Sequence, residues 1–328
     1  MERTIRALGL MSGGLDSMLA AALLRAQGLD ITGICFVTPF FGAARAAAAA
    51  AHLCLPLIVV DFTEKFLPLL YDPPHGWGKG HNPCIDCHIL MLREAGAVLA
   101  AGGFDLVFTG EVLGQRPMSQ NRDSLNLVAR QSGLADLLLR PLSAKLLKAT
   151  QPELLGWVDR ERLLDFSGRG RKRQIALAAE YGITQYPAPA GGCLLTDPRY
   201  AARLKELLRH QSRASRQDLE LLNWGRHFRL AVGAKAVVGR TQKENEALLT
   251  LMTGDNFLLK VQNLPGPLVL VTGETVGAAD LEEAAGLAAA YSDAPEGAPV
   301  VVSVAKDGQT RLLELAAPPK SRFKDRLI

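Results

Sequence analysis

The feature that most constrains this chain is a glycine-rich turn between an apolar run and a helical pattern near its start. The apolar run covers residues 5–10, the turn reads SGGLDS over residues 12–17, and an Ala- and Leu-rich helical pattern follows over residues 16–27. Glycines at 13 and 14 let the backbone approach an anion without a Cβ clash. Free N–H groups at a helix start, with the hydroxyls of Ser12 and Ser17, predict a cradle for a pyrophosphate.

Two other interpretations of this turn imply different chemistry. A Walker A loop is excluded, because the Gly-Lys-[Ser/Thr] ending is missing. A bare Ser-Gly-Gly would indicate an ordinary strand-to-helix turn, with Asp16 capping the helix. The complete SGGLDS after an apolar strand favours phosphate binding.

Apolar runs alternate with helical patterns through the first half of the chain. Strand-like runs at 31–37, 57–60 and 106–109 alternate with helical patterns at 43–53 and 87–101. This order predicts an α/β fold with a doubly wound parallel sheet, whose ligands bind at the C-terminal ends of the strands. Further helices are predicted at 144–157, 171–181 and 199–224.

The pattern changes from about residue 226 to short strands separated by Pro/Gly turns. Strands are predicted at 236–239, 257–261, 268–272, 300–304 and 311–315, with a helix at 278–291 and a loosely ordered tail after 318. We therefore predict a smaller C-terminal α+β domain. The predicted division is residues 1–205 for the first domain, 206–228 for a basic helical linker and 229–328 for the second domain.

The composition narrows the class of protein. A chain of 328 residues with 48% hydrophobic residues favours two globular domains. The net charge of +4 permits a nucleic-acid partner without requiring one. No stretch is typical of a signal peptide or a membrane span, and five cysteines make a disulfide framework improbable. We expect a cytoplasmic protein with no membrane partner.

The SGGLDS turn resembles the SGGxDS motif of the PP-loop ATP pyrophosphatases, which have a HUP-type (adenine nucleotide alpha hydrolase-like) fold and cleave ATP to AMP and pyrophosphate. The resemblance implies ATP and Mg²⁺ as cofactors, with the turn binding the β- and γ-phosphates and a substrate oxygen attacking the α-phosphate. It implies a catalytic role for Asp16. The nucleotide-binding residues that it implies are Leu10, Met11, Ser12, Gly13, Gly14, Asp16, Ser17 and Phe36.

A second polar segment follows the strand-like run at 106–109. It reads TGEVLGQRPMSQ over residues 109–120 and resembles the TGExLGQxxSQ segment of tRNA 4-thiouridine synthetases of the ThiI type, with one additional residue. The resemblance implies that Gly110, Gln115 and Gln120 contact ATP. An ordinary polar loop between a strand and a helix is the alternative for this segment taken alone.

Two cysteines form a CxxC pair in the segment NPCIDCH, residues 82–88. A CxxC at a helix start lowers thiol pKa values and favours thiolate chemistry or metal ligation. The segment is similar to NPDxxCN of tRNA 2-thiouridylases of the MnmA type. That resemblance implies that Cys87 and the downstream Cys193, which follows the glycine-rich residues 189–192, are catalytic. Cys84 stands where that family has an aspartate.

Three thiols allow three interpretations. Cys84, Cys87 and Cys193 could ligate three irons of a [4Fe–4S] cluster and leave the fourth iron open to sulfide, which is the interpretation that we favour. A persulfide on Cys87 or Cys193, resolved as a disulfide, is the second. Structural zinc with His81 or His88 as the fourth ligand is the third. The remaining cysteines, Cys35 and Cys54, lie in apolar patterns and are predicted to pack in the core.

Basic stretches indicate contact with RNA. Residues 169–173 read RGRKR, and arginines outnumber acids between 199 and 229. Such stripes suit RNA phosphates, although a solvated helix face has the same composition.

The C-terminal segment from 231 to 306 resembles the NFACT RNA-binding (NFACT-R) domain. It contains VGRTQKEN at 238–245, a Pro-Gly turn at 265–266 and LEEAA at 281–285. The strand that carries a histidine in that family reads Leu259-Lys260-Val261 here. No THUMP module of 4-thiouridine synthetases is recognisable, so we expect RNA docking to differ.

Together these patterns predict an ATP-dependent tRNA uridine sulfurtransferase that adenylates a uridine carbonyl oxygen and replaces it with sulfur. The expected partners are tRNA or another RNA, and a sulfur donor that is sulfide or a cysteine desulfurase or persulfide carrier; a homodimer is left open. The alternative is a PP-loop amide-forming ligase or small-molecule thiolase that does not act on RNA. A non-catalytic RNA-binding factor is disfavoured by the intact Ser12, Asp16 and Ser17.

Overall fold

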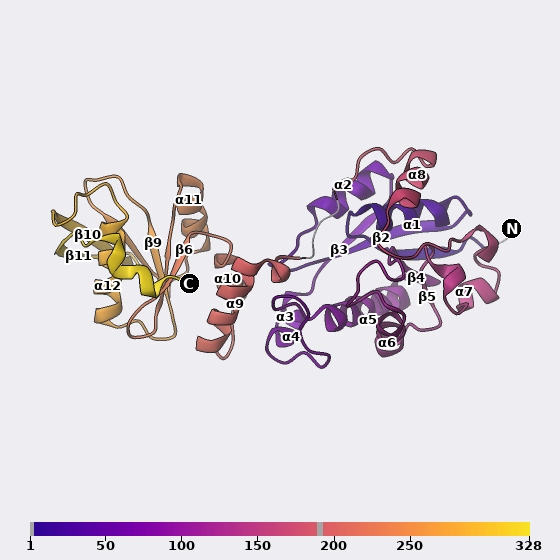
Figure 1. The fold of residues 1–328 in the computed structure, drawn as a ribbon, viewed down its shortest axis with the longest axis horizontal. Helices are drawn as coiled ribbons and strands as arrows, with labels where there is room; N and C mark the ends of the chain where they lie inside the picture. Colours follow the sequence, from indigo (N-terminus) through magenta and orange to yellow (C-terminus); the bar gives the residue numbers. More distant parts are fainter. Residues whose placement is uncertain (1–2, 189–192) are drawn as a thin grey trace. The chain divides into compact units, whose positions relative to one another are not determined.

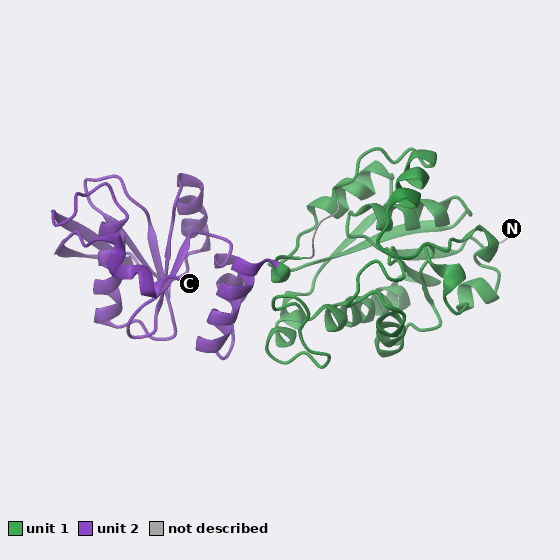
Figure 2. Cartoon of the chain, in the orientation of Figure 1, with its two compact units in different colours: residues 1–196 green, residues 197–328 purple. Residues whose placement is uncertain are grey.

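The computed structural model describes residues 3–188 and 193–328, which form two compact units (Figure 2). The first unit comprises residues 1–196 and the second comprises residues 197–328. The three-part division predicted from the sequence remains a proposal.

The first unit contains a parallel sheet, as predicted. Its strands are β1 (Arg6–Leu10), β2 (Asp30–Val37), β3 (Leu57–Asp61), β4 (Leu106–Thr109) and β5 (Leu138–Leu139). They are arranged in the order β3-β2-β1-β4-β5, and all four pairings are parallel. The short β5 was not predicted, because two apolar residues carry no periodicity.

Helices cover both faces of this sheet. They are α1 (Leu15–Arg25), α2 (Ala44–His52), α3 (Thr63–Phe66), α4 (Pro68–Tyr71), α5 (Cys84–Gly102), α6 (Arg122–Ser132), α7 (Gln151–Leu154) and α8 (Lys172–Glu180). Figure 1 shows α1, α2 and α8 on one face and α5 and α6 on the other. The predicted helix at 144–157 is wrong: a 3₁₀ turn, η1 (Ala144–Leu146), precedes α7, whose first turn contains Pro152. Proline suits the first turn of a new helix and breaks the interior of a longer one.

The strand order places a crevice beside β1. The chain moves from β1 outward to β2 and β3, and returns to the other side of β1 with β4. Leu10 at the end of β1 pairs with Thr109 at the end of β4. The loops that leave these two strands therefore start side by side at the switch point, where doubly wound sheets bind ligands.

The second unit is an α+β fold, as predicted. Its strands are β6 (Arg226–Arg229), β7 (Lys235–Val238), β8 (Phe257–Val261), β9 (Val269–Thr272), β10 (Pro299–Lys306) and β11 (Gln309–Ala316). They form an antiparallel sheet in the order β11-β10-β8-β9-β7-β6. One face packs against α12 (Ala278–Ala290), whose small alanines allow close contact with the strands. A smaller cluster on the remaining side joins Leu221 and Leu248 to β7 and β9.

Two predictions for the second unit are wrong. The helix expected at 199–224 is divided into α9 (Pro198–His210) and α10 (Arg216–Leu221), because the Ser215 hydroxyl caps a new helix. The tail is ordered: η4 (Lys320–Arg326) buries Phe323 against Gly286 of α12. α11 (Gln242–Leu251) was not predicted. In the described part of the chain no helix is long and apolar enough to cross a membrane.

Candidate active site

The turn after β1 has the geometry of an anion cradle. Gly13 has φ +75°, and a Cβ on it would collide with the backbone of Arg45, so only glycine fits there. The Ser17 hydroxyl donates to the Gly14 carbonyl at 2.8 Å, and the Ser12 hydroxyl accepts from the Gly14 N–H at 3.3 Å. Gly14 is the N-cap of α1 and no side chain caps the helix, so the first-turn N–H groups are available to an anion. Asp16 lies inside the helix and is not its cap.

The loop after β4 packs directly on this turn. A Cβ on Gly110 would lie 2.5 Å from the Asp16 carbonyl carbon and the Ser17 nitrogen, so the two backbones are in close contact. The Gln115 amide donates to the Asp16 carboxylate at 3.0 Å. Gln120 is buried, and its backbone closes the loop through bonds with Gly114 (2.7 Å) and Arg116 (2.8 Å). The structure thus brings together the two segments that the sequence singled out.

One carboxylate oxygen of Asp16 is not used in a hydrogen bond with any described residue. Burial raises the pKa of its carboxyl group, while the Gln115 hydrogen bond, Arg171 and Arg116 act against burial. The Oδ2 atom accepts from Gln115, whereas the buried Oδ1 atom has no hydrogen-bond partner among the described residues. A carboxylate oxygen left open beside a phosphate cradle is the type of ligand that Mg²⁺ uses.

The predicted adenine contacts lie at the ends of adjacent strands. Leu10 pairs with Ile34, and the Met11 N–H donates to the Ile34 carbonyl at 2.8 Å. Met11 and Phe36 are buried, and the Phe36 ring packs 5.2 Å from the ring of Phe62. Contact of these residues with adenine remains a prediction.

The structure brings the three predicted thiols into one region of the first unit. Cys84 opens α5, Cys87 lies one turn later, and the His81 N–H bonds the Leu195 carbonyl at 3.1 Å, which ties the region of Cys193 to the start of α5. Residues 189–192, the glycine-rich segment before Cys193, lie outside the described residues. All five cysteines are free.

The expected lowering of thiol pKa values is wrong for this site. Burial raises the pKa of Cys87 well above its ordinary value, and Cys193 and Cys84 raise it further. Burial and the nearby Cys84 raise the pKa of Cys193 to about 11. Burial also raises the pKa of Cys84, against the influence of Arg116 and a hydrogen bond from Asn82. Desolvation of three neighbouring thiols outweighs the helix start and disfavours their thiolate forms.

The zinc interpretation gains no support. The His81 Nε2 atom bonds the Leu70 carbonyl at 2.8 Å, and the His88 Nδ1 atom bonds Glu111 at 3.1 Å. Within residues 3–188 and 193–328, no group of three or more His, Cys, Asp or Glu side chains is arranged to hold one metal ion.

Two arginines were missed as site residues. Arg116 acts electrostatically on Asp16 and also on the Cys84 and Cys193 thiols. Arg171, predicted as an RNA contact within RGRKR, instead acts on Asp16, and its buried Nε has no partner among the described atoms. The only sequence signal for Arg116 was its place inside the segment at 109–120.

The buried Glu111 carboxylate joins the loop after β4 to Arg140 beyond β5 and to His88 on the cysteine helix. The Glu111 carboxylate accepts from Arg140 Nε at 2.8 Å, from His88 Nδ1 at 3.1 Å and from the Thr109 hydroxyl at 3.0 Å. Burial alone would raise the pKa of Glu111, but Arg140 and His88 outweigh burial and hold it well below its usual range. Because His88 follows Cys87 directly, this network connects the nucleotide loop with the thiol site.

Two further sequence predictions are partly wrong. Cys35 is buried, as predicted, but Cys54 is exposed at φ +52°, in the turn after α2. The arginines between 199 and 229 do not form one free stripe: Arg203 donates to the carbonyls of Leu222 and Gly225, and Arg229 pairs with Glu206 at 2.6 Å.

Comparisons with known proteins match each unit separately. Residues 4–146 match the family model of thiamine biosynthesis protein (ThiI), and residues 225–324 match that of the NFACT protein RNA binding domain. The tRNA-specific 2-thiouridylase MnmA of Cutibacterium acnes is 33% identical over 131 residues, which cover 32% of this chain and 34% of that protein. MnmA of Helicobacter hepaticus is 33% identical over 170 residues, or 44% of this chain and 49% of that protein.

The chain thus spans between about a third and a half of the length of these two relatives. Among solved structures, a 4-thiouridine synthetase–RNA complex with bound ATP is 20% identical, with a TM-score of 0.36 over 54% of this chain and 51% of that one. The resemblances to ThiI, to MnmA and to the NFACT-R domain are confirmed: the first unit is similar to the PP-loop tRNA-thiolation proteins ThiI and MnmA, and residues 225–324 of the second match the NFACT RNA-binding model.

Proposed function

We propose that this chain is an ATP-dependent tRNA uridine sulfurtransferase of the cytoplasm. One observation carries the proposal: the loop after β4, which holds Arg116, packs on the phosphate turn, where the Gln115 amide donates to Asp16 at 3.0 Å. In keeping with this packing, the charge of Arg116 acts against burial on the pKa values of Asp16, Cys84 and Cys193. A loop that contacts the phosphate turn and carries a charge acting on the thiols supports one composite site, in which an oxygen is activated near the place where sulfur would be held. An amide-forming ligase has no use for three thiols at that point.

In the first step, a uridine carbonyl oxygen bonds to the α-phosphorus of ATP, and the bond to the β-phosphate oxygen breaks, so that pyrophosphate leaves. The first-turn N–H groups of α1 and the hydroxyls of Ser12 and Ser17 are positioned to hold the departing phosphates. The open Oδ1 of Asp16 supports Mg²⁺ binding there.

In the second step, sulfur bonds to the activated carbon and AMP departs with the original oxygen. Adenylation is required because a carbonyl oxygen is a poor leaving group, whereas AMP is a good one. Arg116 is suited to stabilise negative charge on AMP as it leaves, since its charge also acts on Cys84 and Cys193. Sulfide or a persulfide carrier would supply the sulfur.

The donor set fits a [4Fe–4S] cluster better than a single ion. The Cys84 and Cys193 thiols are near enough to raise the pKa of Cys87, and Cys84 raises that of Cys193, although among the described residues the three do not form the ligand set of one ion. A cluster needs no such convergence, because each thiolate ligates a different iron. When bound, it would supply an open iron that holds sulfide. A persulfide on Cys87 or Cys193 remains the alternative.

The test is an anaerobic assay with the full chain, ATP, Mg²⁺, sulfide and unmodified tRNA. We expect pyrophosphate, AMP and a thiolated nucleoside detectable by mass spectrometry. Pyrophosphate release that requires an amine or another small acceptor, with no sulfur in RNA, would identify a ligase instead. Iron-free, colourless protein that still thiolates RNA would exclude the cluster and favour the persulfide.

Two sets of variants separate the two steps. Cys84→Ala, Cys87→Ala and Cys193→Ala should abolish sulfur incorporation while pyrophosphate release continues, because these thiols do not bind the phosphates. Cys54→Ala, which alters an exposed thiol outside the site, is the matched control and should change neither step. Ser17→Ala should lower pyrophosphate release itself.

A further inference from the structure

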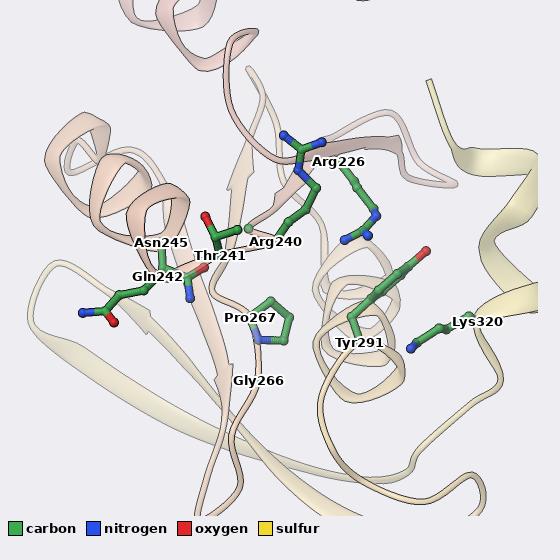
Figure 3. Close-up of a pocket in the computed structure, with 10 residues that line it drawn as sticks. Arg226, Arg240, Thr241, Gln242, Asn245, Gly266, Pro267, Tyr291 and Lys320 are labelled. Atoms are coloured by element: carbon green, nitrogen blue, oxygen red, sulfur yellow. The ribbon is translucent and has the colours of Figure 1, made fainter.

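The second unit contains a cationic pocket beside the Pro-Gly turn. Its volume is about 400 Å³, within the range of small-molecule sites, and it lies where β6, the start of α11 and the end of α12 approach one another (Figure 3). Three lining side chains are cationic and none is acidic: Arg226, Arg240 and Lys320. The ligand must therefore be an anion.

The three cations are not equivalent. Arg240 is held by Glu244, with Nε 2.9 Å from the carboxylate, and Figure 3 shows its guanidinium directed away from Tyr291. Arg226 and Lys320 form no ion pair with any described residue; instead they lie 5.1 and 5.5 Å from the centre of the Tyr291 ring, on either side of it (Figure 3). A tyrosine between two cations positions them without neutralising them.

Most residues of the VGRTQKEN segment build the pocket wall. The Asn245 side chain accepts from the Leu268 N–H at 3.1 Å, and a Cβ on Gly239 would collide with Asn245, so glycine is required there. Thr241 caps α11 by accepting from the Glu244 N–H, and Thr241 and Gln242 at this helix start line the pocket. The uncompensated charge comes from Arg226 and Lys320, both outside that segment.

We propose that this pocket binds a backbone phosphate of the RNA substrate, with Arg226 and Lys320 as its two cationic ligands. The choice of RNA as the ligand rests on the proposed function. The new element is the site that holds its phosphate. Because the cations lie by the faces of the Tyr291 ring, no base stacks there without displacing one of them. Contact is thus with phosphate and carries no base preference.

The experiment measures binding of labelled, unfractionated tRNA to the full chain over a series of salt concentrations. Arg226→Gln and Lys320→Gln should each weaken binding by roughly 3- to 10-fold at low salt and lower the slope of log K against log salt by about one. The double variant should lower the slope by about two. Homopolymeric RNAs of different base should compete equally.

The matched control is Lys243→Gln, which removes an equal charge from an exposed position on α11 outside the pocket. Its affinity should stay within twofold of wild type, and circular dichroism should show that all variants are folded. A double variant that binds tRNA as wild type does, with an unchanged slope, overturns the pocket while leaving the proposed function standing.

Three other outcomes distinguish the pocket from the proposed function. Wild-type protein that binds no RNA overturns both the pocket and the proposed function. Inorganic phosphate that displaces tRNA at matched ionic strength in wild type, but not in the double variant, assigns the pocket to free phosphate and overturns the RNA ligand. Variants that lose tRNA affinity but release pyrophosphate as wild type does at saturating tRNA support both the phosphate pocket and the proposed function.

Discussion

Replacing Glu111 by glutamine tests whether the buried Glu111–Arg140 ion pair stabilises the loop after β4 against the segment that follows β5. Glutamine keeps the shape of the side chain but removes its charge, leaving the Arg140 guanidinium, 6% exposed, without its anion. Removing one member of a buried pair costs about 3–5 kcal/mol. We expect a loss of about 3 kcal/mol in the free energy of unfolding, near the lower end, because the amide oxygen can still accept one hydrogen bond from Arg140.

The assay is guanidinium denaturation followed by tryptophan fluorescence in a Trp224→Phe background. Trp77 and Trp157 then report on the first unit alone. In a double-mutant cycle, Glu111→Gln combined with Arg140→Met should be less destabilised than the sum of the single variants by about 2 kcal/mol, because the two changes remove one interaction. Additive losses would show that the pair has no such coupling.

The pH dependence of the free energy of unfolding gives an independent check on the contribution of Glu111. The pKa of Glu111 is held below its ordinary value of 4.5, so its contribution is present above pH 4.5 and is lost as the pH falls below that value. Below pH 4.5 the Glu111 carboxylate is protonated in the unfolded chain but stays ionised in the folded chain. The difference between wild type and variant should shrink by about 1.4 kcal/mol per pH unit below 4.5. A variant within about 1 kcal/mol of wild type at pH 7, or a difference independent of pH, refutes the reasoning.

Three further predictions follow from the same geometry. Gly110→Ala should lower pyrophosphate release by about a hundredfold, because its Cβ forces the two loops apart, whereas Gly42→Ala, with nothing within 4 Å, should not. Burial lowers the pKa of Lys235 to about 8, so the free energy of unfolding of the second unit should rise by up to about 3 kcal/mol between pH 8 and pH 10.5. Lys235→Met should abolish this rise. If the rise persists in the variant, another group is responsible for it. Iodoacetamide should alkylate the exposed Cys54 long before the buried Cys87, as peptide mapping would show; equal rates would contradict the burial.

Local patterns of apolar and polar residues were sufficient to predict most of the fold. The alternation of apolar runs and helices predicted four of the five parallel strands within one or two residues, because each strand is a short apolar run that stands apart from the helical patterns beside it. Predictions failed where a single residue redirects the chain. Pro152 and Ser215 start new helices, and the tail is ordered by one buried ring, Phe323.

The site was predictable only in part for the same reason. The turn SGGLDS by itself indicated the positive φ at Gly13, because that conformation depends on neighbouring residues, whereas the close contact of Gly13 with the Arg45 backbone is tertiary. The tertiary structure decided that Arg116 acts on both Asp16 and the thiols, and that Glu111 pairs with Arg140. It also reversed the predicted direction of the thiol pKa values. Burial and charge depend on which distant segments meet in space, and no local pattern contains that information.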